Sequence, residues 1–208
     1  MQQIQTVTTI YKFSELSEEG KQAAIEKLRN DTQENGDYAW QSEYHESLTG
    51  FCKSTGITLK NYSYGPYSHN YINWNYELEI DLTKLTGLRL RTWLINNWIP
   101  EWEKGKYYST GGKWIHNKYC YKKRYSNCQK EISCPFTGFV GDMDIIDPVT
   151  KFIKSPDNNI SLDCIIRECF DSFIKAYCAE MESQDSDEYI IDTIEANDYD
   201  FTEDGSIY

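Results

Sequence analysis

Three aspartates lie close together in "SCPFTGFVGDMDIIDPVTKF", residues 133–152, and they are the residues most suggestive of chemistry in this chain. A calcium loop of the EF-hand type carries oxygen ligands at alternate positions and closes with a glutamate at position 12. Asp142 and Asp144 begin that spacing, but position 12 counted from Asp142 is Ile153. A two-metal site for phosphoryl transfer would need further carboxylates from elsewhere in the chain.

Helix capping explains the same aspartates without a metal. Asp147 stands directly before Pro148, and an N-cap followed by proline at the first helical position is a common helix start. The spacing of Val149, Phe152 and Ile153 then predicts an inward face. Asp142 could cap the preceding turn in the same way. We therefore interpret the cluster as caps and expect no bound metal.

Histidine and cysteine offer a second candidate metal site. His116 and Cys120 are four positions apart, and Cys128 and Cys134 follow, so zinc ligation is chemically reasonable. No CxxC or HxxxH pair supports it, however, and no motif indicates a Cys-His nucleophile. We expect no metal, no cofactor, no catalytic residues and no enzymatic activity.

Composition limits the classes of function. The chain has 208 residues, a net charge of −12 and an aromatic content of 15%, which suits one aromatic-rich domain. The negative charge argues against binding of nucleic acid or an anionic membrane by the whole molecule. No apolar run approaches the roughly 18 residues of a membrane span, and "MQQIQTVTTI" lacks the features of a signal peptide. Seven irregularly spaced cysteines favour the reducing cytoplasm.

Charge is unevenly distributed along the chain. Residues 102–130 carry 8 basic and 1 acidic side chains, whereas residues 141–208 carry 4 basic and 18 acidic ones. The sequence shows no internal repeat and no linker. It therefore predicts a single domain over 1–208, with a basic aromatic hairpin-like insert at about 102–130 and an acidic C-terminal region at about 141–208.

Residue patterns predict an α+β fold in which an antiparallel sheet packs with several helices. A strand over 4–13 should precede a helix capped by Ser17, and a second helix is expected over about 38–55. Strands should flank a Gly65-Pro66 turn, with the alternating apolar residues of 72–80 on one face. Helices are predicted over 84–100, from Ser161 as the long C-terminal helix, and after Ser186. A hairpin about Asp204-Gly205 should end the chain.

The basic insert interleaves lysines with aromatic residues. Cations can follow a phosphate backbone while aromatic faces stack on unpaired bases, so the insert is a candidate nucleic-acid patch. It could equally be a protein interface, or a solvated hairpin with a Gly111-Gly112 turn. Its candidate contact residues are Trp114, Lys118, Tyr121, Lys122, Lys123 and Arg124.

The acidic C-terminal region is the other candidate site. A strongly negative face with embedded aromatics can occupy a basic, nucleic-acid-binding channel on another protein. It could also be only a solvated surface. Tyr189 and Tyr199 are candidate anchors. The candidate acidic contacts are Asp185, Asp187, Glu188, Asp192, Glu195, Asp198 and Asp200.

Three stretches carry a family resemblance: "YKFSELSEEGKQAAIEKLR", "CPFTGFVGDMDII" and "SDEYIIDTIEANDYDFTEDGSIY". They resemble a widespread group of uncharacterised proteins of tailed bacteriophages, some of them labelled antitoxin-like. The resemblance covers about half of the chain, implies a phage gene product acting in the host bacterial cytoplasm, and transfers no catalytic residue.

Two functions follow as hypotheses. In the first, a phage accessory protein binds and inhibits a bacterial defence component, such as a CRISPR effector or another nuclease system, by anti-CRISPR-like mimicry of nucleic acid. The alternative is a small nucleic-acid-binding or regulatory, antitoxin-like protein. A metal-dependent enzyme ranks third. The oligomeric state stays open.

Overall fold

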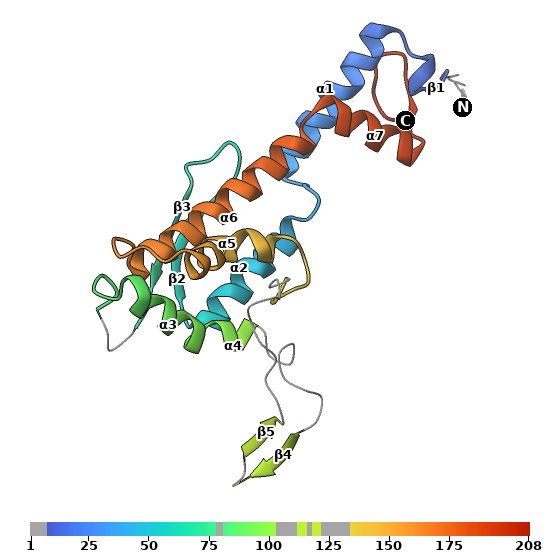
Figure 1. Cartoon of the computed structure of the whole chain (residues 1–208). Helices are drawn as coiled ribbons and strands as arrows, with labels where there is room; N and C mark the ends of the chain where they lie inside the picture. Colours follow the sequence, from blue (N-terminus) through green and yellow to red (C-terminus); the bar gives the residue numbers. More distant parts are fainter. Residues whose placement is uncertain (1–7, 78–80, 103–111, 116–117, 122–133) are drawn as a thin grey trace, which may run out of the picture. The chain divides into compact units, whose positions relative to one another are not determined.

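A computed structural model of the chain describes residues 8–77, 81–102, 112–115, 118–121 and 134–208 (Figure 1). Helices and short antiparallel strand pairs form two compact units. Unit 1 comprises residues 1–41 and 179–208, and unit 2 comprises residues 42–178. The predicted α+β class is confirmed. The predicted single domain stays a prediction. Helix α6 (Leu162–Gln184) contributes residues 162–178 to unit 2 and residues 179–184 to unit 1.

Unit 1 brings the two ends of the chain together. Strand β1 (Tyr11–Lys12) pairs antiparallel with β6 (Asp200–Phe201), and a 3-10 helix (Phe13–Glu15) follows β1. Helices α1 (Glu18–Asn35) and α7 (Asp187–Asn197) pack together. Their shared core consists of Leu16, Ala24, Ile25, Ile190, Ile194 and Phe201.

Local sequence signals set the helix ends of unit 1. The Ser17 hydroxyl accepts a hydrogen bond from the Gly20 amide at 3.1 Å, and Ser186 accepts one from Tyr189 at 3.3 Å. Both serines are therefore N-caps. The cap at Ser17 was predicted, and α7 begins directly after Ser186, where a helix was expected. Gly36 ends α1 in the left-handed conformation, with φ of 67°.

The last turn of the chain is fixed against α1. Gly205 has φ of 77°, and a Cβ placed there would lie 2.6 Å from both the Ala24 nitrogen and the Gly20 oxygen. Glycine is thus needed for its conformation and for its lack of a side chain. Phe201 and Ile207 pair in an antiparallel β-bridge across this turn, which confirms the predicted terminal hairpin.

Helix α2 (Gln41–Thr55) supplies the central residue of the core of unit 2. The other elements are β2 (Thr58–Ser63), β3 (Tyr71–Asn75), α3 (Gly87–Asn97), α4 (Ile99–Trp102), β4 (Gly112–Ile115), β5 (Lys118–Tyr121), α5 (Gly141–Lys154) and the 162–178 part of α6. Phe51 of α2 is fully buried, and its ring contacts Trp98, Trp102, Phe136 and Phe170 at centroid distances of 5.9–6.2 Å. This aromatic cluster is the centre of the unit's core.

Four local predictions need correction. The described strands form separate two-stranded antiparallel pairs, β1–β6, β2–β3 and β4–β5, and not one larger sheet. The turn predicted at Gly111-Gly112 is wrong at Gly112, which begins β4 and pairs with Tyr121, while Gly111 lies outside the described residues. Helix α3 ends at Asn97, and Pro100 lies inside α4. Strand β3 ends at Asn75, while residues 78–80 and 1–7 lie outside the described part.

The predicted cap at Asp147 is also wrong. Helix α5 starts at Gly141 and continues through Asp147 and Pro148. Within the described ranges, no helix is both long and apolar enough to cross a bilayer.

Candidate functional site

Asp142, the first residue of the aspartate cluster, is a structural carboxylate. Its side chain is completely buried. Oδ2 accepts hydrogen bonds from the backbone amides of Phe136, Thr137 and Gly138 at 2.8, 2.8 and 3.2 Å, and Oδ1 accepts one from the Thr137 hydroxyl at 3.0 Å. This carboxylate therefore organises the loop that precedes α5. Asp142 thus bonds to the preceding turn, which it was expected to cap, but it does so from inside α5 and not as a residue that precedes a helix.

The other two aspartates have different surroundings. Asp147 forms an ion pair with Lys151 at 2.6 Å on the surface of α5. Burial raises the pKa of Asp144, the nearby Asp147 charge adds to this rise, and a hydrogen bond with Tyr44 opposes it. No group of three or more potential ligands is placed to hold a metal ion in the described part of the chain. Residues His116 and Cys128 of the alternative zinc site lie outside that part.

A contact with α6 explains how Pro148 is accommodated in a helix. Proline lacks the amide hydrogen that would bond to the carbonyl four residues earlier, that of Asp144. The Ser172 hydroxyl donates to this carbonyl at 2.7 Å. The missing helical hydrogen bond is thus replaced by one from a neighbouring helix.

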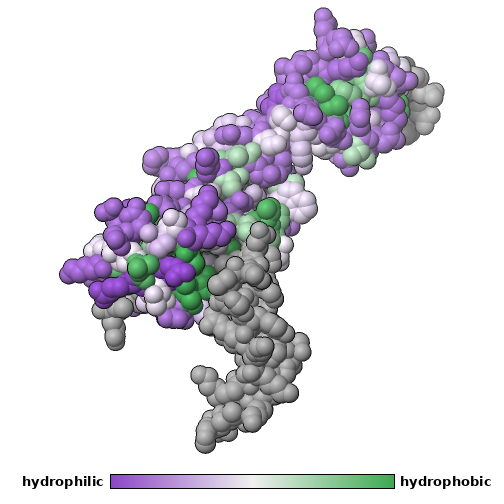
Figure 2. All heavy atoms as spheres, viewed as in Figure 1, coloured by the Kyte–Doolittle hydropathy of each residue, from purple (hydrophilic) through white to green (hydrophobic). Residues whose placement is uncertain are grey.

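Unit 1 carries all of the protein's excess negative charge. Its sequence holds 18 acidic and 4 basic side chains, whereas that of unit 2 holds 15 acidic and 17 basic ones. The net charges are therefore −14 and +2. Hydrophilic residues cover most of the visible face of the described parts (Figure 2). The charge division makes unit 1 the candidate site for a basic partner.

Ion pairs and hydrogen bonds inside unit 1 occupy four of the seven predicted acidic contacts. Lys12 binds both Asp198 and Asp200, at 3.0 and 2.9 Å. Arg29 forms an ion pair with Asp187. Asp185 accepts a hydrogen bond from the Tyr38 hydroxyl at 3.1 Å and one from the Gln33 amide at 3.1 Å. The charges of these four carboxylates are therefore partly satisfied by side chains of unit 1 itself.

The remaining three acidic residues form a row on α7. Glu188, Asp192 and Glu195 are exposed and follow the i, i+4, i+7 spacing of one helix face. Buried Ile190 and Ile194 lie on the core side of the same helix. Neighbouring positions of this kind lie about 5–6 Å apart. We call Glu188, Asp192 and Glu195 the α7 acidic row.

The two predicted tyrosine anchors differ in exposure. Tyr189 is 38% exposed on α7, one residue after Glu188. Tyr199 is partly buried against the core of unit 1. Tyr189 is therefore available to a partner, whereas Tyr199 serves mainly in packing.

Sequence reasoning missed three basic residues whose ion pairs distinguish the paired carboxylates of unit 1 from the α7 acidic row. Lys12, Lys27 and Arg29 all lie near the N-terminus, far along the chain from their acidic partners. Lys27 binds Asp204 at 2.8 Å and also donates to the backbone oxygen of that residue. In the sequence, the sign of these pairings was the small number of basic residues in unit 1. In the structure, most of those residues face acidic ones.

Two aromatic residues that flank most of the basic insert, Trp102 and Phe136, pack in the core of unit 2. Trp102 at the end of α4 is 2% exposed, and its indole donates to the Ser54 hydroxyl at 2.9 Å. Its ring lies 6.0 Å from that of Phe136, the residue at which the chain returns. A Cβ at Gly50 would lie 2.6 Å from the Phe136 Cβ, so α2 packs closely against the returning chain.

The predicted contact residues of the insert are only partly described. Trp114 belongs to β4, and Lys118 and Tyr121 belong to β5, which pair as an antiparallel hairpin. Lys122, Lys123 and Arg124 lie outside the described residues. The predicted nucleic-acid contact of this insert therefore stays a prediction.

Comparison of the chain with protein-family models, with curated proteins and with solved structures finds no match. The resemblance to tailed-phage proteins thus stays a prediction, and the site must be interpreted from its own geometry.

Proposed function

We propose that this protein is a phage accessory protein that binds and inhibits a bacterial defence component through unit 1. The partner would be a CRISPR effector or another nuclease-type system with a basic surface for nucleic acid. The observation that carries this proposal is the net charge of −14 confined to unit 1, with the α7 acidic row exposed.

The geometry supports binding by charge complementarity. Exposed carboxylates in a row attract a basic surface, accelerate encounter and help to set the orientation of the partner. The ion pairs of Lys12, Lys27 and Arg29 offset part of the repulsion among the other carboxylates of unit 1. Tyr189 beside the row adds apolar contact area that slows dissociation. A protein bound in this way blocks nucleic acid from the partner's basic channel without catalysis or a cofactor.

The proposed place of action is the cytoplasm of the host bacterium. Three of the described cysteines, Cys52, Cys164 and Cys169, are free thiols. Reduced cysteines are the usual state in that compartment. The resemblance of the two chain ends to phage proteins supports the same location.

Charge reversal tests the proposal in infected cells. The variant Glu188→Lys, Asp192→Lys, Glu195→Lys should lose protection of a phage from the defence system while retaining its circular dichroism spectrum. The control reverses three exposed carboxylates of unit 2, Glu46, Glu168 and Asp171, and changes the net charge equally. The control should still protect. Full protection by the α7 variant would show that the row is only a solvated surface.

A further inference from the structure

The β2–β3 hairpin of unit 2 differs in charge from the rest of the chain. The chain has 33 acidic residues, yet residues 47–76 contain none. The same stretch contains Lys53, Lys60 and His69, together with several tyrosines and asparagines. A stretch without carboxylates in a strongly acidic protein suits an anionic ligand. The next carboxylate along the chain, Glu77, lies just after the end of β3, where its Oε1 accepts a hydrogen bond from the Asn75 side-chain amide at 3.4 Å.

The inner face of the hairpin is packed firmly against α6. The Tyr64 ring lies 4.9 Å from that of Tyr177 and 5.3 Å from that of Phe173. The Trp74 ring contacts Phe170 at 6.4 Å. These contacts hold the two strands in place, so the opposite face is a fixed platform.

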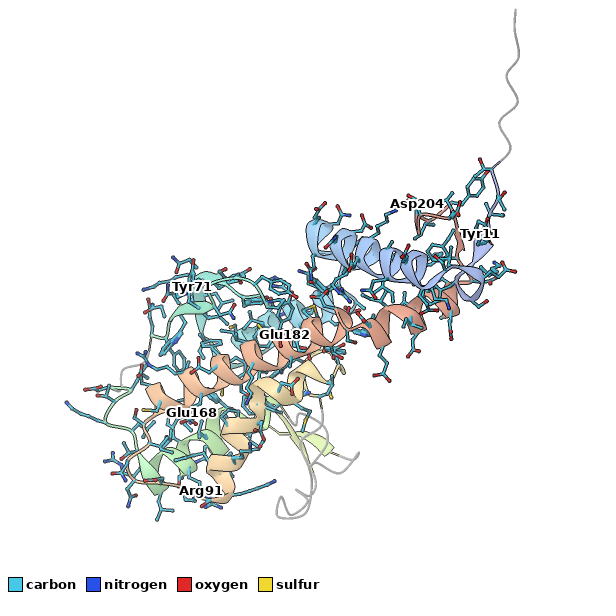
Figure 3. All side chains as sticks on the ribbon, turned by 90° about the horizontal axis from the view of Figure 1, so that it is seen from above. Tyr11, Tyr71, Arg91, Glu168, Glu182 and Asp204 are labelled. Atoms are coloured by element: carbon cyan, nitrogen blue, oxygen red, sulfur yellow. The ribbon has the colours of Figure 1, made fainter. Side chains whose placement is uncertain are left out.

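The outer face of the hairpin combines rings with amides. Asn61 lies opposite Asn73, and Ser63 lies opposite Tyr71, so these four residues share one face. Asn61 and Asn73 are exposed, and their side chains bond at 2.7 Å. Tyr71, labelled in Figure 3, is 37% exposed. Its ring lies 5.9 Å from that of exposed His69.

This face has the groups that recognise unpaired bases. Tyrosine and histidine rings stack on bases. Asparagine amides can both donate to and accept from base edges. Lys60 is exposed at the irregularity in β2 between Leu59 and Asn61, where an ammonium can meet a phosphate.

We propose that the outer face of the β2–β3 hairpin binds single-stranded nucleic acid, with a base stacked on Tyr71 and His69 and its edge bonded by Asn73. The lack of acidic residues within 47–76 favours this ligand over a protein partner, for which no such exclusion is needed. The site lies in unit 2 and rests on no part of the function proposed for unit 1.

Fluorescence anisotropy of the full chain tests this site. The probes are fluorescein-labelled oligo(dT), oligo(dA) and oligo(rU) of about 16 nucleotides, long enough for a single-strand site. We expect Tyr71→Ala to weaken binding at least about 5-fold, the effect of losing one base stack. Tyr71→Phe should bind like the wild type. Asn73→Ala should change the ratio of affinities for oligo(dA) and oligo(dT), which a purely structural role would not do.

Two further variants distinguish this face from unit 1 and from the basic insert as the place where the probe binds. Tyr189→Ala removes an equally exposed tyrosine of unit 1 and should leave binding unchanged. Because the face offers one or two cations, log Kd should change with log salt with a slope of only about 1 in magnitude. The inference is overturned if the wild type binds none of the probes, which would leave the face to a protein partner. It is also overturned if Tyr71→Ala binds normally while Lys122→Glu, Lys123→Glu, Arg124→Glu abolishes binding, since the basic insert would then be the site.

Discussion

Replacement of Asp142 should reveal how much one buried carboxylate contributes to unit 2. Oδ2 alone accepts all three amide hydrogen bonds from the 136–138 loop, while Oδ1 accepts only from the Thr137 hydroxyl. Asparagine can therefore place its oxygen at the Oδ2 position and keep the amides bonded. Leucine has a similar shape but leaves all three amides without this acceptor.

The two substitutions should differ clearly in cost. An unsatisfied buried donor costs about 1–3 kcal/mol. Thr137 and Gly138 are exposed residues whose amides water can partly reach after the change. We therefore expect Asp142→Leu to lower the free energy of unfolding by about 3 kcal/mol and Asp142→Asn by about 1 kcal/mol.

Urea unfolding followed by tryptophan fluorescence is a suitable assay, because buried Trp98 and Trp102 report on unit 2. The matched control is Asp147→Ala on the same helix. It removes the surface ion pair with Lys151 and the negative charge near Asp144, and it should cost less than about 1 kcal/mol. A loss below about 1 kcal/mol for Asp142→Leu would refute the structural role of this carboxylate.

Three further predictions concern packing and pH. Ser172→Ala should cost about 1 kcal/mol in urea unfolding, and less in a Pro148→Ala background, where the helix supplies its own amide; equal costs in both backgrounds would contradict the proposed replacement of the helical hydrogen bond. Gly205→Ala should lower the melting temperature more than Gly36→Ala, because both glycines have positive φ but a Cβ at Gly36 meets no atom within 4 Å; equal losses would show that close packing at Gly205 is unimportant. The Lys27 ammonium, with Thr202 and Ser206, lowers the pKa of Asp204 from its ordinary 3.8. The stabilising effect of the ionised Asp204 carboxylate is therefore complete well above pH 3.8 and is lost as the pH falls below that value. Asp204→Asn should accordingly flatten the acid limb of a pH–stability curve, and an unchanged limb would count against the Lys27 contact.

Local signals in the sequence predicted much of the fold. Ser17 and Ser186 cap helices because their hydroxyls bond to amides only three residues ahead. Gly56 follows α2 with a φ of 80°, as a helix-ending glycine should. These interactions depend on neighbours in the chain, so a single sequence contains the information they need.

Interactions between distant residues could not be predicted in the same way. Asp147 and Pro148 have the pattern of a helix start, yet Ser172, 28 residues beyond Asp144, accommodates proline inside α5. The sequence likewise predicted one continuous acidic surface. Lys12 binds Asp198 and Asp200 from the other end of the chain, so only part of that charge remains for a partner.

Capture of partners from bacterial lysate, identified by mass spectrometry, tests the central proposal most directly. The wild-type protein should retain a defence protein with a basic nucleic-acid-binding surface. Rising salt should release that protein, because attraction between exposed charges is already screened beyond about 8 Å at physiological ionic strength and over shorter distances in higher salt. The variant with lysine at the α7 acidic row should fail to retain that protein, whereas the control reversed at Glu46, Glu168 and Asp171 should retain it. Retention of the same proteins by both variants would contradict the proposal.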